Sequence, residues 1–239
     1  MPTILITGAS RGLGLEFVRQ YAGDGWQVIA CARDLARTPE LGALAAESAG
    51  RVSVHALDIA DHAAIDALAN RTAGAPIDVL LNNAGTMGRH SFAEKGMTIQ
   101  RFGESDYADW VEIMRINVFA PMKMAEAFVE HVAASAQKKI VTLTSIVGSI
   151  GQNTFGSLYA YRSSKAAANC VMHAMAMDLK KRGIVAVPMH PGWVRTDIGG
   201  SRAELDVVQS VSGMRRVIAG LTAESSGRFF QWDGREVPW

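Results

Sequence analysis

Short apolar segments alternate with longer helical segments along the whole chain, and this alternation most constrains the fold. Runs rich in Val and Ile, typical of strands buried on both faces, lie at residues 3–7, 26–32, 51–57, 77–81, 139–144, 184–189 and 228–232. Between them, apolar residues recur with helical spacing at 12–23, 35–49, 61–73, 106–134 and 161–181. This order predicts one doubly wound α/β domain of Rossmann type over residues 1–239, with a central parallel sheet of about seven strands flanked by helices.

Two irregular segments interrupt the pattern. Residues 86–105 contain Gly without regular apolar spacing, and residues 197–225 are punctuated by Gly and Ser, with a weak helical pattern around 203–219. Both follow predicted strands, so we expect them at the carboxyl ends of the sheet, where open α/β sheets bind ligands. No internal repeat, low-complexity tract or linker divides the chain.

The composition favours a folded cytoplasmic protein with no strongly charged partner. Lys and Arg number 24 against 23 Asp and Glu, a net charge of +1, so we expect neither a nucleic acid nor a membrane as partner. The uncharged stretch 140–161 is interrupted by hydroxyl and amide side chains and is not expected to span a membrane. Cys31 and Cys170 are far apart and the histidines form no cluster, so neither a disulfide nor a metal site is predicted. Residues 3–7 already form the first predicted strand, so we expect no leader segment ahead of the fold.

A glycine-rich turn joins the first predicted strand to the first predicted helix. It reads Thr7-Gly8-Ala9-Ser10-Arg11-Gly12-Leu13-Gly14. Glycines at such a turn let backbone N–H groups and a helix N-terminus approach a pyrophosphate, and the absence of a Gly-Lys-Ser/Thr ending disfavours ATP or GTP. A tight turn without a ligand is the alternative. The candidate cofactor contacts here are Gly8, Ser10, Arg11, Gly12, Leu13 and Gly14.

The end of the second predicted strand bears on the choice between NAD(H) and NADP(H). An acidic residue there would accept from the ribose 2′-hydroxyl, whereas Arg would pair with a 2′-phosphate. The sequence places Arg33 before Asp34, and Arg11 could reach the same phosphate. Two guanidiniums suit a dianion, so we expect NADP(H) in preference to NAD(H). The alternative is that Arg33 and Asp34 form a solvated loop pair.

The third and fourth predicted strands also end on candidate cofactor contacts. Asp58 could accept a hydrogen bond from an adenine amino group, with Ile59 beside it, or could cap the next helix. The fourth strand runs into Asn83, Ala84 and Gly85. Amides at this position could link neighbouring strands and contact the cofactor's ribose.

Tyr161 and Lys165 form a candidate catalytic pair. They are four residues apart and therefore share one face of a helix. A free phenol titrates near about 10, and a nearby ammonium stabilises the phenolate, which predicts a lowered pKa for Tyr161. Tyr161 would then act as general acid in carbonyl reduction and as base in alcohol oxidation.

Together these motifs resemble the short-chain dehydrogenase/reductase family. The resemblance runs from residue 3 to the C-terminus and is carried, in the family's order, by residues 7–14, 82–85, Ser145 and 161–165. Residues 148–162 and 229–239 further resemble the branch that holds sniffer-type carbonyl reductases and bacterial C-factor signalling proteins. The resemblance implies a reversible, NADP(H)-dependent reduction of a small-molecule ketone or aldehyde.

The resemblance also implies roles for further residues of the catalytic group. Ser145 would donate a hydrogen bond to the substrate oxygen, where negative charge develops. It lies 16 residues before Tyr161, a longer spacing than is usual in the family, and Ser149 is the competing candidate. Lys165 would also hold the nicotinamide ribose, and Asn117 would support a proton-relay water.

A Pro-Gly segment follows the sixth predicted strand and matches the family's. By resemblance, Val194 and Thr196 would contact the nicotinamide carboxamide, and the cofactor-contacting set of this segment is Pro191, Gly192, Val194 and Thr196. Arg195 and Asp197 are expected to form a local ion pair.

Three functions are consistent with these residues. The favoured one is a carbonyl reductase, because a pure sensor has no need of Ser145, Tyr161 and Lys165 together. The alternative is a dinucleotide-binding signalling or regulatory protein with little relevant turnover. A nucleotide-sugar epimerase is disfavoured, since it usually needs a further substrate domain. The helix of residues 161–181 is apolar around most of its circumference, which predicts a homo-oligomer, a dimer or tetramer.

Overall fold

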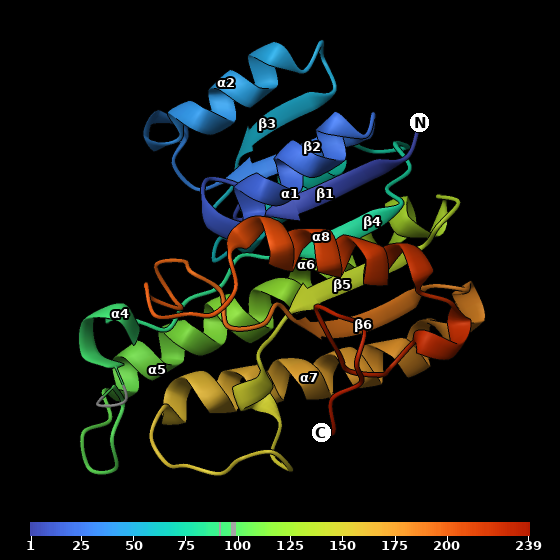
Figure 1. Cartoon of the computed structure of the whole chain (residues 1–239). Helices are drawn as coiled ribbons and strands as arrows, with labels where there is room; N and C mark the ends of the chain where they lie inside the picture. Colours follow the sequence, from blue (N-terminus) through green and yellow to red (C-terminus); the bar gives the residue numbers. More distant parts are fainter. Residues whose placement is uncertain (91, 97–98) are drawn as a thin grey trace.

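The computed structural model describes residues 1–90, 92–96 and 99–239, and within them seven parallel strands form one sheet. The order in the sheet is β3-β2-β1-β4-β5-β6-β7 (Figure 1). The strands are β1 (Thr3–Thr7), β2 (Gln27–Ala32), β3 (Val52–Ala56), β4 (Val79–Asn82), β5 (Lys139–Leu143), β6 (Val185–His190) and β7 (Phe230–Gln231). The chain reverses its direction of travel across the sheet between β1 and β4, the point at which such sheets bind ligands. The doubly wound α/β fold is confirmed.

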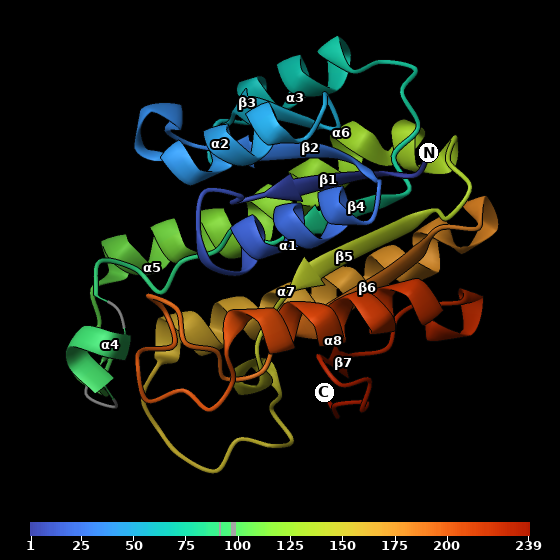
Figure 2. The ribbon, with the colours of Figure 1, turned by 45° about the horizontal axis from the view of Figure 1, so that its top comes forward.

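Helices cover both faces of the sheet, as Figures 1 and 2 show. Alternate residues of each strand point to opposite faces, so Ile4 and Ile6 belong to one buried cluster and Leu5 to the other. The first cluster is covered by α1 (Gly12–Gly23), α2 (Pro39–Glu47) and α8 (Val207–Gly220). The second is covered by α3 (His62–Arg71), α6 (Ala120–Ala133) and α7 (Tyr159–Leu179).

Two predicted helices are divided in the structure. The segment predicted as one helix over 106–134 consists of α5 (Tyr107–Met114), a π-helical turn (Arg115–Phe119) and α6. The Ala120 N–H bonds the Arg115 carbonyl five residues back, a geometry that often marks functional sites. The segment predicted over 35–49 starts with a 3-10 turn (Leu35–Arg37), and α2 begins at Pro39, which favours a first helical position.

The described residues of the segment 86–105, and residues 197–206 of the second segment, lie beyond the carboxyl ends of the strands, at the left of Figure 1, whereas the rest of the second segment runs back along the sheet as α8. The segment after β4 contains one short helix, α4 (Phe92–Lys95), and the segment after β6 leads into α8. In the described residues, no helix is both long enough and apolar enough to cross a membrane.

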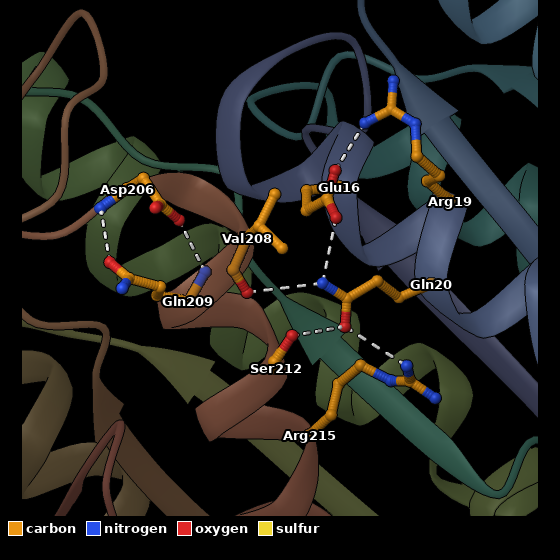
Figure 3. A network of polar contacts seen from close by, with 8 residues as sticks. All are labelled: Glu16, Arg19, Gln20, Asp206, Val208, Gln209, Ser212 and Arg215. Atoms are coloured by element: carbon orange, nitrogen blue, oxygen red, sulfur yellow. Dashed lines mark hydrogen bonds and ion pairs between the residues drawn. The ribbon is translucent and has the colours of Figure 1, made fainter.

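A polar network fixes α8 against α1, and Gln20 is at its centre (Figure 3). Its Nε2 donates to Glu16 Oε1 at 2.9 Å and to the Val208 carbonyl at 3.4 Å. Its Oε1 accepts from Ser212 Oγ and from Arg215 Nη1, both at 3.2 Å. The network therefore ties the helix that begins at the glycine-rich turn to the helix that follows the Pro-Gly segment.

Candidate active site

The glycine-rich turn is packed so closely that side chains are excluded from it. A Cβ on Gly14 would lie 2.1 Å from the Gly8 carbonyl oxygen, and one on Gly8 would lie 2.9 Å from Ala84 Cα. Gly8 also has φ +68°, a conformation that favours glycine. The Ala9 N–H donates to the Cys31 carbonyl at 2.9 Å and holds the turn to the end of β2. These contacts place the turn where a pyrophosphate could meet backbone and the start of α1.

Thr7 joins the glycine-rich turn to the end of β4. Its buried Oγ1 accepts from the N–H groups of Asn83 and Ala84, both at 3.1 Å. Asn83 Nδ2 donates in return to the carbonyls of Thr7 at 2.8 Å and Gly8 at 3.1 Å. Asn83 thus links the two strands as expected, while its contact with a ribose stays a prediction. Thr7 opens the glycine-rich motif but was not among the predicted site residues.

The Arg33 guanidinium is exposed and makes no ion pair within the described part of the chain. Asp34 does not pair with it, because its carboxylate caps the 3-10 turn by accepting from the Ala36 N–H at 3.0 Å. The solvated loop pair considered for Arg33 and Asp34 is therefore wrong. Arg33 stands at the end of β2 with a guanidinium that a phosphate could engage.

The expected ion pair between Arg195 and Asp197 is also wrong. Asp197 Oδ2 lies 3.1 Å from Arg11 Nε instead, and Arg195 lies 4.0 Å from Asp206. The sequence order hides this partnership because Arg11 follows β1 whereas Asp197 follows β6. The pair joins the two segments at the carboxyl edge, and since both side chains are mostly exposed it contributes little to stability.

Asp58 does not cap the helix that follows it. Its Oδ1 accepts from the Ala60 N–H at 2.9 Å, while Asp61 caps α3 by accepting from the Ala64 N–H at 3.1 Å. Asp58 is exposed at the end of β3 and Ile59 is buried beside it. The capping alternative is thereby removed, and the adenine contact stays a prediction.

Lys165 is buried beside Tyr161 on α7. The side chain is 5% exposed, and its Nζ donates to the Leu143 carbonyl, at the end of β5, at 3.0 Å. The same Nζ lies 5.6 Å from the centroid of the Tyr161 ring. Burial lowers the pKa of Lys165 to about 8, because removal from water disfavours the charged form.

The pKa of Tyr161 moves in the direction opposite to the one predicted. Burial raises it to about 12, and the hydrogen bond with the Ser145 side chain opposes this effect without reversing it. Desolvation of the phenolate outweighs the ammonium that the sequence places one turn away. Tyr161 therefore keeps its proton at neutral pH, the state that a proton donor needs.

Ser145 and Ser149, the two serine candidates, have different surroundings. The Ser145 Oγ accepts from the Val147 N–H at 3.4 Å, and the hydroxyl lies close enough to the phenol to lower the pKa of Tyr161. Ser149 is buried, and its Oγ donates to the carbonyls of Pro238 and, at 3.3 Å, Trp239. The second serine is thus committed to holding the last residues of the chain, and Ser145 is the one beside the phenol.

Asn117 lies in the π-helical turn and joins the end of β4 to α7. Its Oδ1 accepts from the Thr86 N–H at 2.9 Å, and its Nδ2 donates to the Thr86 carbonyl at 2.8 Å and to Ser164 Oγ at 2.9 Å. A Cβ on Gly85 would lie 3.3 Å from Asn117 Oδ1 and 3.4 Å from Lys165 Nζ. The Asn117 side chain therefore packs beside the lysine, but its hydrogen bonds are already committed to protein groups.

The Pro-Gly segment faces the glycine-rich turn. Gly192 has φ +85°, and a Cβ on Gly12 would lie 3.6 Å from Thr196 Cγ2. The Pro191 carbonyl accepts from a serine hydroxyl of α8, and the Val194 side chain is buried. The structure therefore brings this segment, the glycine-rich turn and the Tyr161 helix to the same edge of the sheet (Figure 1).

These features define a protein of the dinucleotide-binding α/β class, with a tyrosine, a lysine and a serine gathered at the carboxyl edge of the sheet, at the end of β5. A sequence model described as short chain dehydrogenase matches residues 2–206. The chain belongs to this family of oxidoreductases, which confirms the family predicted from the motifs.

Individual relatives support the narrower resemblance. C-signal of Myxococcus xanthus is 43% identical over 173 residues, which cover 72% of this chain and 99% of the relative. The structure of the carbonyl reductase Sniffer of D. melanogaster is 30% identical, with a TM-score of 0.89 and complete coverage of both chains. An NADPH-bound carbonyl reductase from chicken fatty liver is 31% identical, with a TM-score of 0.89, covering 100% of this chain and 99% of the other.

Proposed function

We propose that the protein reduces a ketone or aldehyde to the alcohol with NADPH, and that it catalyses the reverse oxidation at the same site. The observation that carries this proposal is a half-buried, protonated Tyr161 next to Ser145 and Lys165. NADPH, when bound, supplies the hydride. The protein's own residues have to orient the carbonyl, stabilise its oxygen and deliver a proton.

Each polar group of the site has one role in this proposal. Tyr161 donates its proton to the carbonyl oxygen during reduction and takes it back during oxidation. Ser145 donates a hydrogen bond to the same oxygen, where negative charge develops. Lys165 carries a positive charge at pH 7, would hold the ribose next to the nicotinamide, and stabilises the phenolate that remains after Tyr161 has given up its proton. Asn117 keeps the end of β4 against α7, and its segment supports a relay water.

The chain's geometry fits a dinucleotide. The close contacts among Gly8, Gly14 and Ala84 exclude side chains at the two glycines, so backbone lies uncovered at the start of α1, which supports a pyrophosphate there. Arg33, with no ion-pair partner in the part of the chain described, and the exposed Arg11 support NADP(H) over NAD(H). The NADPH-bound carbonyl reductase of similar fold is consistent with that preference.

The other proposed cofactor contacts follow the sheet from adenine to nicotinamide. Asp58 and Ile59 at the end of β3 would meet the adenine. Asn83, Ala84 and Gly85 at the end of β4 would meet the ribose. The nicotinamide would lie against the Pro-Gly segment, with Val194 and Thr196 beside its carboxamide.

A signalling role without turnover is the second candidate, and the observation that favours it is the name of the relative C-signal. The gathered Ser145, Tyr161 and Lys165 support the enzyme instead. The cytoplasmic location and the homo-oligomer also stay predictions. Met177 on the outer side of α7 is 63% exposed in the single chain. A second subunit that packed against this face of α7 would cover it, which supports the homo-oligomer.

The test combines binding and turnover. NADPH and NADH are titrated by fluorescence, and the loaded protein is then assayed on a panel of ketones and aldehydes beside Tyr161→Phe. We expect tighter binding of NADPH than of NADH and turnover that depends on Tyr161. NADPH binding without turnover on any carbonyl would overturn the enzyme and leave the signalling candidate.

A further inference from the structure

The helix that carries Tyr161 has no N-terminal cap of its own. The first N–H groups of any helix need acceptors from outside it. The residue before α7 is Leu158, whose apolar side chain provides none. A helix that must hold a catalytic side chain in place therefore starts without the local Ser, Thr, Asp or Asn that usually fixes such an end.

A distant glutamine supplies the missing acceptor. Gln100 Oε1 accepts from the backbone N–H of Tyr161 at 2.9 Å, across 61 residues of sequence. Tyr161 is the third residue of α7, one of the two positions that an ordinary cap serves. Gln100 Nε2 donates to the Met87 carbonyl at 2.9 Å. One side chain thus bonds the start of the catalytic helix and the beginning of the segment between β4 and α5.

Apolar contacts reinforce the same junction. Met87, Ile99 and Leu158 form a small buried cluster, and the Tyr161 side chain packs against it. The Leu158 N–H also donates to the Ile99 carbonyl at 3.4 Å. Ile99 and Gln100 are therefore packed directly against the first turn of α7.

The backbone at this junction is held in an uncommon conformation on both sides. Gln100 has φ +53°, Ser157 has φ +67° and Leu158 has φ +60°, in the left-handed region that residues other than glycine seldom adopt. Such conformations persist where the surrounding structure fixes them, and they cluster at functional sites. Here they aim the Gln100 side chain at the helix and turn the chain into α7.

We propose that Gln100 is a positioning residue that caps the Tyr161 helix from the segment after β4 and so fixes the phenol relative to Ser145 and Lys165. This inference rests on the proposed function, in which Tyr161 donates a proton. Gln100 itself touches no reacting atom in this account. Loss of the Gln100 side chain should therefore lower kcat, because the phenol is held less precisely for proton donation. The affinity for NADPH should not change, because in this proposal the cofactor binds at the glycine-rich turn.

The test compares substitutions that separate the two hydrogen bonds. Gln100→Leu removes both of them, whereas Gln100→Glu keeps an acceptor for the Tyr161 N–H, where the helix dipole also favours a negative charge. Gln137→Leu is the matched control, since Gln137 likewise accepts one hydrogen bond, from Lys139 at 3.2 Å, at the opposite edge of the sheet. Each variant is measured for kcat and KM, for NADPH affinity and for hydrogen exchange of the Tyr161 amide.

We expect Gln100→Leu to lower kcat about tenfold while NADPH affinity stays within about twofold. The Tyr161 amide should exchange faster in this variant, whereas Gln100→Glu should restore both its protection and most of kcat. Gln137→Leu should match the wild type in both readouts. If Gln100→Leu fails to fold, Gln100→Asn, whose side chain is too short to reach both partners, takes its place.

Two results would overturn the proposal: unchanged protection of the Tyr161 amide in Gln100→Leu, or equal losses of kcat in Gln100→Leu and Gln100→Glu. The exchange measurement needs no turnover. A wild type that reduces no carbonyl would thus refute the proposed function, while amide exchange would still decide whether Gln100 caps the helix.

Discussion

Replacing Lys165 by Met should make the protein more stable at neutral pH while abolishing its turnover. The burial of this lysine lowers its pKa from 10.5 to about 8. Because one pKa unit corresponds to about 1.4 kcal/mol, keeping the ammonium charged at pH 7 costs the folded state about 3 kcal/mol. Met fills nearly the same volume without the charge. The Leu143 carbonyl, however, loses its hydrogen bond with the lysine, and this loss lowers the free energy of unfolding by about 1 kcal/mol. The net gain expected for Lys165→Met is about 2 kcal/mol.

The gain should depend on pH in a direction fixed by the lowered pKa. Below pH 8 the folded and the unfolded wild type both carry the charge, so the full cost is present. Between pH 8 and 10.5 the folded state releases the proton that the unfolded state still holds, so the cost to the wild type disappears as pH rises. At pH 10 the remaining cost and the lost hydrogen bond are each about 1 kcal/mol, and the two proteins should be equally stable.

Urea unfolding followed by far-UV circular dichroism measures the difference in the free energy of unfolding between Lys165→Met and the wild type at pH 7 and at pH 10. The matched control is Lys139→Met, because Lys139 is also buried but donates to the Ile218 and Ala219 carbonyls at 2.8 and 3.1 Å. That variant should be destabilised, since it removes the Lys139 donor from both carbonyls and leaves Ile218 with only the Leu221 N–H, at 3.3 Å, and it should keep its turnover. A Lys165→Met protein less stable than the wild type at pH 7, or equally stabilised at both pH values, would refute the reasoning.

Five further substitutions test separate parts of the account. Gly14→Ala should lose NADPH binding and about 2–3 kcal/mol of stability, because its Cβ would lie 2.1 Å from a backbone carbonyl oxygen; dye binding to the cofactor site and thermal melting measure both. Gln20→Leu should cost about 1–2 kcal/mol by urea unfolding, since it removes the centre of the α1–α8 network. Ser149→Ala should cost about 1 kcal/mol and leave kcat near the wild-type value, in contrast to Ser145→Ala, which should lower kcat. Arg33→Ala should lower the affinity for NADPH about tenfold and leave the affinity for NADH unchanged, as measured by fluorescence titration.

The fold could be predicted from the sequence because buried parallel strands and amphipathic helices each leave their own apolar spacing. The strand β7 is shorter than expected, two residues within the predicted 228–232. The π-helical turn around Asn117 was not predicted, because one extra residue in a helical turn hardly changes the apolar pattern over the 106–134 segment.

The site was predictable where its residues are close in sequence. The glycine-rich turn and the Tyr161–Lys165 spacing define their geometry locally, and the structure brings both to one edge of the sheet. Contacts between distant segments could not be predicted. The pairing of Arg11 with Asp197 and the capping of α7 by Gln100 depend on how loops meet in space.

The pKa of Tyr161 shows a different limit. The sequence displays the positive charge of Lys165 but not the depth at which both groups are buried. Desolvation depends on the whole packed site, and it decides the direction of the shift. Tyr161 holds its proton at neutral pH with either direction of shift, but the raised pKa makes the phenol a weaker acid, so the shift by itself gives the reductive direction no advantage.

The most direct test of the central claim is the rate of NADPH oxidation by wild type and Tyr161→Phe on the same carbonyl substrate, with NADPH affinity measured in parallel. The account predicts that the variant binds NADPH within about threefold of the wild type and loses at least about 100-fold in kcat, because only the proton donor has been removed. A Tyr161→Phe protein that turns over at the wild-type rate would contradict the account.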